Sequence, residues 1–432
     1  MKNIINIVLS LIFASYLLVS ININFGKNKW QDVLESDAWG YYAYLPAVFV
    51  YQDLHFTFYE KIMHGGYFEE RLAYEYRVGN DGKVANKYFC GTAVAISPFY
   101  IIAHIISPFF GYSNDGYNRI YILSVNIAAV FYTVLGLFFL SKLLSQYTKN
   151  VLHVILVIIT VAFGTQLFYY SFGEPGMSHV YSFCFVNLFL WKMKSWFADI
   201  EQDKRGANLF CAAFALGMIF LIRPFNILIL LALPFIAGSF NILKNKIMEL
   251  FKQKYVLMIS VSIFVITAGI QLLIYFIQTG NLWVDSYPGE NFNFLNPHFT
   301  EVLFSFKKGL FIYTPLFLVA QAGVYFLFKS NKFMFVAYLL FFTVLTYVLS
   351  CWWIWYYGGS FSMRPYIEYF GLFTILLIVL LENFKQKRLL ILVMLLIVVL
   401  CQIQTYQYRY FVIHWSEMDK AKYLESLQHI FS

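Results

Sequence analysis

The first residues that could do chemistry lie at 36–46, Ser-Asp-Ala-Trp-Gly-Tyr-Tyr-Ala-Tyr-Leu-Pro. The Asp37 carboxylate could take a proton from an attacking hydroxyl group, which is the role of a general base. Tyr41, Tyr42 and Tyr44 offer hydroxyl groups for hydrogen bonds and ring faces for stacking on a sugar. The same pattern is also typical of an N-capping aspartate that begins an interfacial helix with a tyrosine belt. From the spacing alone, both interpretations stay open.

A second acidic residue lies in the segment Gly-Glu-Pro-Gly-Met-Ser-His at 173–179, between two apolar runs. Glu174 and His179 could act together there, because ionisable side chains at membrane depth are usually functional. The alternative is that Ser178 caps a helix and that Glu174 is simply solvated. We treat Glu174 as a candidate catalytic residue and His179 as a candidate substrate-binding residue.

Three cationic side chains could bind a phosphate. Arg223 is enclosed in an apolar run and needs an anionic partner, either a carboxylate or a lipid phosphate. Lys308 precedes another apolar run, and Arg364 follows the flexible pair at 358–359. A guanidinium group suits a phosphate because it can donate two parallel hydrogen bonds. The alternative for Arg364 is a salt bridge to Glu368, four residues further on.

Several kinds of site are missing from the sequence. There is no Walker A, GxGxxG or HExxH motif, and no His/Cys cluster has the spacing of metal ligands. The five cysteines are widely spaced and do not form a disulfide framework. We therefore expect no nucleotide donor, no metal site and no other cofactor, although a divalent cation stays possible.

The composition indicates which elements must position these residues. Of the 432 residues, 60% are hydrophobic and only 12% are charged, whereas soluble domains carry about 25% charged residues. So few charges could not cover the surface of a soluble protein, and the composition also excludes a disordered or collagen-like chain. The sequence therefore predicts an all-α, polytopic membrane protein.

Nine apolar runs are long enough, at about 20 residues, to cross the hydrocarbon layer. They are residues 4–24, 119–141, 151–171, 178–197, 255–278, 310–328, 333–351, 367–382 and 389–405. The runs at 92–112 and 209–238 are ambiguous because proline residues interrupt them. We interpret 4–24 as a retained anchor rather than a cleaved signal peptide, because it is long and lacks an A-x-A-like site.

Charge decides the topology. Five short loops hold 15 Lys and Arg residues, which places these loops in the cytoplasm. They are residues 142–150, 192–208, 241–254, 329–332 and 384–388. An even number of crossings between them requires that 92–112 stays on the outer surface and that 209–238 crosses as two short helices. This gives about 11 spans, with the N-terminus inside and the C-terminus outside.

The predicted organisation is a transmembrane domain over residues 1–405 and a short extracytoplasmic tail over 406–432. Residues 25–118 form a long first outer loop, and a loop of this length is expected to contain structure of its own. We expect juxtamembrane helices in it, with 92–112 as one of them. The polar candidates all fall on this outer side.

These motifs resemble the multi-spanning C-type glycosyltransferases (GT-C), which include protein O-mannosyltransferases and aminoarabinose transferases that use polyprenyl-phosphate sugars. Over residues 1–380 the resemblance rests on the acidic residue within 36–42, the Pro-containing helix from Gly91 to His104, and the break at Arg223-Pro224. Uncharacterised bacterial membrane proteins of this type are similar at 44–47, 177–182 and 308–315. The sequence departs from many members because Asp37 has no acidic neighbour and the tail is too short for a folded outer domain.

The resemblance implies a glycosyltransferase in a bacterial inner membrane with its active site on the extracytoplasmic side. It would move a hexosyl, mannosyl or aminoarabinosyl group from a polyprenyl-phosphate donor, with inversion, to a glycan, lipid or protein acceptor. The role of catalytic base would fall to Asp37, with Glu174 as a second acid, and Arg223, Lys308 and Arg364 would stabilise the leaving phosphate. The scheme requires no nucleic acid and no metal.

Two other functions stay open. A transporter or flippase of lipid-linked sugars would show repeat symmetry and charges at mid-membrane, and neither stands out in the sequence. A ligase or polymerase of whole glycans would also use outer arginines. The first-loop aspartate separates these alternatives, because a base-catalysed transferase needs it and a flippase does not.

Overall fold

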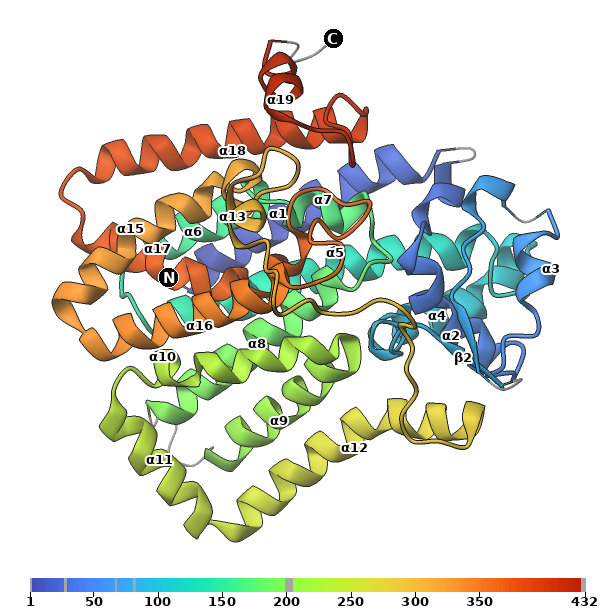
Figure 1. Cartoon of the computed structure of the whole chain (residues 1–432), viewed down its shortest axis with the longest axis horizontal. Coiled ribbons are helices and arrows are strands. Elements are labelled where there is room, and N and C mark those ends of the chain that lie inside the picture. Colours follow the sequence, from blue (N-terminus) through green and yellow to red (C-terminus); the bar gives the residue numbers. More distant parts are fainter. Residues whose placement is uncertain (1, 27–28, 67, 81–82, 199–204, 429–432) are drawn as a thin grey trace.

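Helices make up most of the chain, and many of the long apolar ones run side by side (Figure 1). The computed structural model describes residues 2–26, 29–66, 68–80, 83–198 and 205–428. In this part of the chain, seven helices are long and apolar enough to cross a membrane. The bent pair Pro224–Ala237 and Phe240–Lys252 is an eighth candidate. The prediction of an all-α, polytopic membrane protein is confirmed, and the count of 11 spans stays a prediction.

The bundle is built from helices of 13 to 26 residues, together with the short helix α7. They are α1 (Lys2–Asn24), α5 (Arg119–Leu144), α6 (Val151–Phe163), α7 (Leu167–Phe172), α8 (His179–Phe197), α9 (Arg205–Ile222), α12 (Lys254–Thr279), α15 (Pro315–Ser330), α16 (Lys332–Ser350), α17 (Phe370–Asn383) and α18 (Lys387–Arg409). Helix α8 packs between α5 and α9, and α17 packs against α15. Gly136 allows the close approach of α5 and α8, because a Cβ atom there would lie 2.7 Å from the ring of Phe183.

Two of the predicted spans are interrupted, and their breaks meet. The chain leaves helical geometry between α6 and α7, and again between the short helix α14 (Leu310–Tyr313) and α15. Gln166 lies in the first break and receives a hydrogen bond from the Thr314 hydroxyl at 2.5 Å, while its amide donates to the Tyr313 carbonyl. Backbone groups freed inside a membrane domain need partners of this kind. The side chain of Gln166 therefore stabilises both breaks.

The break expected at Arg223-Pro224 is present. Helix α9 ends at Ile222, and the chain continues as a 3-10 helix, η5 (Pro224–Ala232), followed by α10 (Leu233–Ala237) and α11 (Phe240–Lys252). Pro224 takes the first helical position, where its missing N–H costs nothing. The chain then bends by 119° between α10 and α11.

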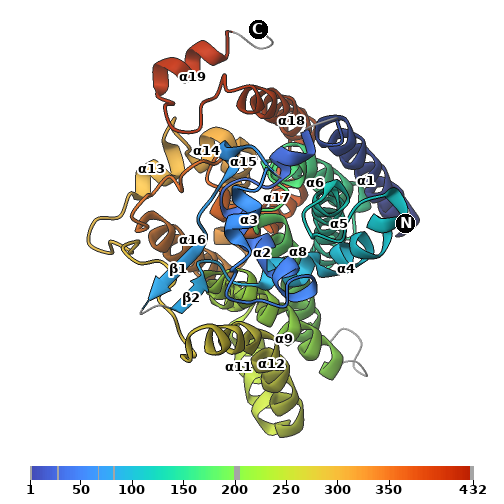
Figure 2. The ribbon, with the colours of Figure 1, turned by 90° about the vertical axis from the view of Figure 1, so that its right-hand side faces the viewer.

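The segment 25–118, predicted to be the first outer loop, contains several short elements and the longer helix α4 (Gly91–Ile106). Its elements are η1 (Lys29–Val33), α2 (Asp37–Phe49), α3 (Tyr59–Met63), η2 (Glu70–Leu72), β1 (Arg77–Asn80), β2 (Lys83–Asn86), α4 (Gly91–Ile106) and η3 (Ser107–Phe110). Strands β1 and β2 pair antiparallel, with Arg77 opposite Asn86. Figure 2 views the molecule from the end that carries this loop and shows α2 and α3 in front of the central helices.

Helix α4 contains the residues predicted to lie on the outer surface. It is seen nearly end-on in Figure 1, whereas α5, α8, α9 and α12 run across the view. Its N-terminus docks on the end of α9, because the Gly91 backbone closely approaches the backbone of Leu221 and Ile222. By length and composition alone, Gly91–Phe110 also qualifies as a span. That 92–112 does not cross the membrane therefore stays a prediction.

The segments predicted to be outside meet at one end of the bundle. Lys87 of the first loop forms an ion pair with Glu290 at 2.5 Å, and Gln278 donates a hydrogen bond to the Leu54 carbonyl at 2.8 Å. The remaining short helices at this end are α13 (Phe299–Phe304), η6 (Arg364–Tyr369) and α19 (Lys420–Ser426). Helix α19 belongs to the predicted tail, of which residues 429–432 lie outside the described part of the chain.

Residues of two basic loops contact neighbouring helix ends. The Thr148 hydroxyl donates to Glu382 at 2.5 Å, and the Asn331 amide donates to the Gly238 carbonyl at 2.8 Å. Within the basic loop 192–208, residues 199–204 lie outside the described part of the chain. Thr148 thus contacts the end of α17, and Asn331, between α15 and α16, contacts the turn between α10 and α11.

Candidate active site

Asp37 is the first residue of α2, at the end of the bundle where the outer segments meet. Ser36, directly before it, has a φ of 49°, a left-handed backbone that a non-glycine residue adopts only when its surroundings enforce it. The turn between α7 and α8 packs against this corner, because a Cβ atom on Gly176 would lie 2.7 Å from the Ala38 side chain. This close approach brings Glu174 of the same turn toward Asp37.

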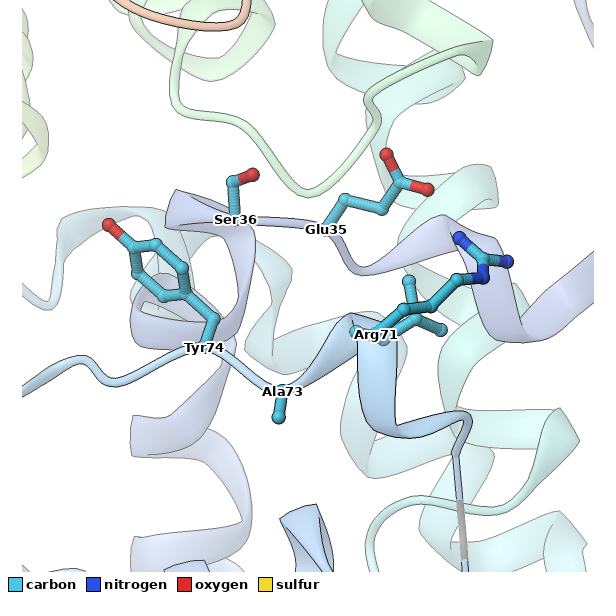
Figure 3. Close-up of a pocket in the computed structure, with 6 residues that line it drawn as sticks. Glu35, Ser36, Arg71, Ala73 and Tyr74 are labelled. Carbon is cyan, nitrogen blue, oxygen red and sulfur yellow. The ribbon is translucent and has the colours of Figure 1, made fainter.

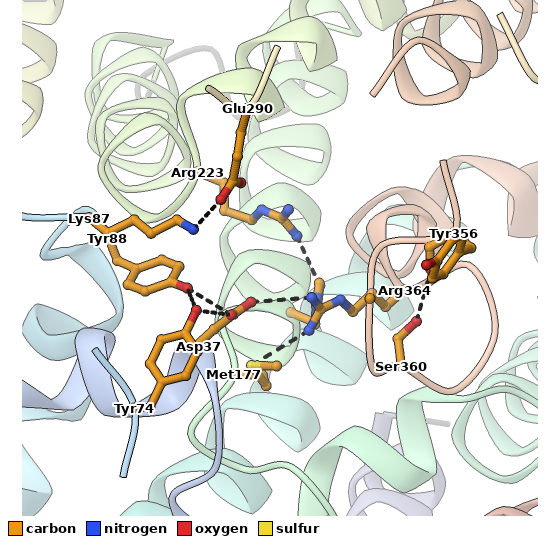
Figure 4. A network of polar contacts seen from close by, with 12 residues as sticks. Asp37, Tyr74, Lys87, Tyr88, Met177, Arg223, Glu290, Tyr356, Ser360 and Arg364 are labelled. Atoms are coloured by element: carbon orange, nitrogen blue, oxygen red, sulfur yellow. Dashed lines mark hydrogen bonds and ion pairs between the residues drawn. The ribbon is translucent and has the colours of Figure 1, made fainter. Parts of the chain in front are cut away.

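The two carboxylate oxygens of Asp37 have different partners (Figure 4). Oδ2 lies 3.2 Å from Nη2 of Arg364, which begins η6 more than 300 residues further along the chain. Oδ1 accepts a hydrogen bond from the Tyr88 hydroxyl at 2.7 Å and a longer one from Tyr74 at 3.3 Å. The hydroxyls of Tyr74 and Tyr88 are themselves 2.5 Å apart. Asp37 is therefore held by a cation on one side and by two phenols on the other.

These partners set the charge of the carboxyl group. Burial raises the pKa of Asp37, but the Arg364 guanidinium, the Tyr88 hydroxyl and the charges of Lys87 and Arg223 together lower it by more, so the pKa lies below its ordinary value. Asp37 is therefore ionised at neutral pH. Its side chain remains 25% exposed, so a hydroxyl group can still reach it.

Arg364 does not form the salt bridge to Glu368 that was considered as its alternative role. Residues 364–369 form a 3-10 helix, with three residues per turn, so side chains four apart do not lie on the same face. Arg364 instead contacts Asp37 and, at 3.8 Å, the sulfur of Met177. Its Nε is buried without a hydrogen-bond partner in the described part of the chain. A buried N–H of this kind costs about 1–3 kcal/mol unless a ligand atom accepts its hydrogen bond.

Glu368 forms a separate buried cluster with two of the predicted site residues. Its Oε1 lies 3.1 Å from Nδ1 of His179, the first residue of α8, and 3.2 Å from Nη1 of Arg223. The Glu368 side chain is fully buried, whereas that of Arg223 is 27% exposed. The anionic partner that the sequence requires for Arg223 is therefore this structural carboxylate, and the exposed part of the guanidinium still faces the site.

Lys308 is buried, and it ties two outer segments together. Its ammonium group donates to the Gly358 carbonyl and, at 2.8 Å, to the Ser360 hydroxyl. Burial lowers the pKa of Lys308 well below its ordinary value. The lysine thus fixes the loop that leads into Arg364, which makes it a positioning residue in this structure.

Glu174 lies in the turn at 173–178, where one carboxylate oxygen, Oε2, is buried and has no partner among the described residues. Burial raises the pKa of Glu174 to about 7, although the nearby Arg364 charge opposes the shift. A carboxyl group with this pKa exchanges a proton near neutral pH, which suits an acid or a base. The expectation that Glu174 is merely solvated does not fit this burial.

The three tyrosines of the first motif have different positions. Tyr42 and Tyr44 are buried, and their hydroxyls donate to the carbonyls of Gly116 at 2.5 Å and Tyr88 at 2.6 Å. Their rings therefore belong to the core that holds α2, and the proposed substrate site does not include them. Tyr41 packs its ring 4.8 Å from that of Tyr88, directly beside the partners of Asp37.

Sequence reasoning missed Tyr74 and Tyr88, which lie 37 and 51 residues after Asp37. No local pattern marks them, since tyrosines are frequent throughout the chain. The described residues contain no group of three or more His, Cys, Asp or Glu side chains that could hold a metal ion.

A polar surface pocket of about 200 Å³ adjoins Asp37 (Figure 3). It is lined by Glu35, Ser36, Arg71, Leu72, Ala73 and Tyr74. In Figure 3 the polar ends of Glu35 and Arg71 point to the same side of the pocket. The Tyr74 hydroxyl links the pocket to Asp37 Oδ1.

Comparison with known proteins gives one structural match. No family model and no curated protein matches the chain. The chain is similar to a crystal structure of the oligosaccharyltransferase of Archaeoglobus fulgidus in complex with zinc and sulfate, at 14% identity and a TM-score of 0.45. The match covers 95% of this chain and 54% of that one, so the chain spans about half the length of the protein that it matches.

Proposed function

We propose that the chain is a membrane glycosyltransferase that transfers a sugar from a polyprenyl-phosphate donor to an acceptor hydroxyl on the extracytoplasmic side, with Asp37 as general base. The observation that carries the proposal is the placement of an ionised, partly exposed carboxylate against a guanidinium group with an unused N–H. A sugar transfer of this type needs both groups, a base for the acceptor and a cation for the leaving phosphate.

The bond changes follow from this arrangement. The acceptor oxygen attacks the anomeric carbon of the donor sugar while its proton passes to Asp37. The bond between the anomeric carbon and the phosphate oxygen breaks, and the phosphate leaves with the electron pair. Attack from the face opposite the leaving group inverts the anomeric centre. The lipid phosphate gains one negative charge, which a fixed cation in a poorly hydrated site stabilises strongly.

Arg364 is suited to this second task. It already uses Nη2 on Asp37, and its buried Nε can donate to a phosphate oxygen without giving up that contact. Arg223 adds a partly exposed guanidinium nearby, held in place by Glu368. The phosphate would arrive from the lipid side, because Arg364 begins the apolar segment that continues as α17.

The decisive experiment is transfer activity of Asp37→Asn in membranes supplied with a panel of polyprenyl-phosphate sugars. Loss of the base at nearly constant size should lower transfer by about 100-fold or more. Asp53→Asn is a matched control, because Asp53 lies in the same loop and only caps local groups of His55 and Thr57. Full activity in Asp37→Asn would reject Asp37 as the base, and lack of turnover by the wild-type chain with every donor would reject the transferase.

A further inference from the structure

The two sides of Asp37 differ in more than their hydrogen-bond partners. On the Oδ2 side lies Arg364, with Arg223 and the apolar helices beyond it, which is where we place the donor phosphate. On the Oδ1 side lies Tyr74, which also lines the polar pocket. A base that accepts a proton from the acceptor must touch the acceptor, so the pocket side of Asp37 is the side left for it.

The lining of the pocket is polar, which favours an opening to water rather than to lipid. Glu35, Ser36 and Arg71 are all solvent-exposed, and no long apolar side chain other than Leu72 lines it. Its volume of about 200 Å³ is below the ~300–1,000 Å³ of clefts that enclose drug-sized ligands, so it has room for about one ring. The occupant therefore comes from the aqueous side and places a single small unit in the pocket.

The charges around the pocket restrict its occupant further. Arg71 is engaged by two carboxylates, Asp32 at 2.7 Å and Glu69 at 2.6 Å. With Glu35 beside them, three carboxylates face the guanidinium groups of Arg71 and Arg409, so the local charge is negative, which disfavours an anionic ligand. A carboxylate, a serine hydroxyl and a tyrosine hydroxyl instead match the donors and acceptors of sugar hydroxyl groups.

We propose that the pocket lined by Glu35, Ser36 and residues 71–74 is the acceptor subsite and binds one uncharged sugar residue of a glycan, with a hydroxyl group directed at Asp37. This inference rests on the proposed function and deepens it, because it selects a carbohydrate acceptor over a lipid or a protein. The sugar hydroxyl would share the Oδ1 side of Asp37 with Tyr74. Its proton passes to Asp37 and its oxygen forms the new glycosidic bond, as in the reaction above.

Binding tests the subsite without requiring turnover. The purified full-length protein in detergent is titrated with a methyl hexopyranoside and, separately, with the corresponding hexuronic acid, and saturation-transfer NMR reports contact. We expect the neutral glycoside to bind and the uronic acid to bind at least about 10-fold more weakly because of Glu35. Glu35→Gln should reduce that difference. Equal binding of both sugars in the wild-type protein, or binding that Ala73→Phe leaves unchanged, would overturn the assignment.

Ala73→Phe adds a bulky side chain at a residue that lines the pocket. Its matched control is Ala421→Phe, at an exposed position of α19 outside the pocket. We expect Ala73→Phe to lower kcat/KM for a glycan acceptor by about 10-fold or more while release of the donor sugar to water stays within about 2-fold of wild type. Ala421→Phe should change neither rate.

Each other outcome has a distinct meaning. If Ala73→Phe leaves glycan transfer unchanged, the pocket is not the acceptor subsite. If acceptor transfer and donor hydrolysis fall together, the pocket serves the donor or the fold, and the assignment is also wrong. If the wild-type chain shows no donor turnover but binds the neutral glycoside through Ala73, the transferase proposal fails and the sugar site stands.

Discussion

The pKa values of Asp37 and Glu174 differ because their surroundings differ. Asp37 has a cation and a phenol in direct contact, and its pKa lies below the ordinary value. Glu174 is buried with one oxygen unpartnered, and its pKa is raised to about 7. A site with two carboxyl groups of such different pKa can assign them opposite roles.

The pH profile distinguishes these roles. If Asp37 is the base, kcat/KM stays high as pH falls and is lost only below the ordinary carboxylate range, because its pKa is lowered. If Glu174 were the base, activity would fall as pH drops through about 7.

Arg364→Ala removes the main opposing charge, so the acidic limb should move to higher pH. Glu368→Gln is the control, because Glu368 pairs with His179 and Arg223 rather than with Asp37, and an equal movement there would contradict the assignment.

Residue types at the site were predictable, but their pairing was not. Asp37, Glu174 and Arg364 stand out in the sequence because charges are rare in this chain. The contact between Asp37 and Arg364 joins residues 327 positions apart, which no local pattern reveals. The alternative pairing of Arg364 with Glu368 assumed an α-helix, and the 3-10 geometry of 364–369 removes that contact.

At the scale of elements, most predictions rested on the positions of prolines and on composition. The break at Arg223-Pro224 follows from the proline, and the length of segment 25–118 indicates that it contains elements of its own. The break after α6 contains no proline, and it depends on Gln166 bonding to a segment nearly 150 residues away. Breaks of this kind arise from tertiary contacts and cannot be located from the local sequence.

The contact of α4 with α9 offers a test of how the first loop is held. A Cβ atom on Gly91 would lie 2.4 Å from backbone atoms of Leu221 and Ile222, which cannot move aside as a side chain can. Gly91→Ala should therefore displace α4 and destabilise the fold, by about 1–3 kcal/mol for an overpacked contact. Thermal unfolding in detergent measures this loss.

The matched control is Gly269→Ala in α12, where a Cβ atom meets nothing within 4 Å. Alanine is the better helix former by about 1 kcal/mol, so the midpoint of Gly269→Ala should stay the same or rise. A Gly91→Ala protein that unfolds at the wild-type temperature would show that the α4–α9 contact is not rigid.

For the whole molecule, the charge pattern makes a prediction that contacts alone do not test. Lys87 of residues 25–118 pairs with Glu290 of residues 279–309, and Asn331 bonds to Gly238, but orientation relative to the cytoplasm rests on the positive-inside rule. Ser113 and Lys149 are both exposed. Ser113 lies in the predicted outer loop 25–118, and Lys149 lies in the predicted cytoplasmic loop 142–150.

Single cysteines at these positions, in a background without the native cysteines, can be labelled in intact cells with an impermeant reagent. We expect labelling at Ser113→Cys and protection at Lys149→Cys until the membrane is permeabilised. The reverse pattern would place 92–112 across the membrane and invert the chain from that point.

The single guanidinium group of Arg364 also has a consequence for the order of substrate addition. In the free protein its charge weakens Asp37 as a base, whereas a donor phosphate bound at Nε would offset that charge and make Asp37 more basic. Donor binding would thereby activate Asp37. An acceptor that binds without the donor would meet an Asp37 carboxylate that is too weakly basic to react. We expect compulsory ordered kinetics with the donor first, so that the spent lipid phosphate inhibits competitively with the donor and noncompetitively with the acceptor. Random addition of the two substrates would show that donor binding does not change the basicity of Asp37 through Arg364.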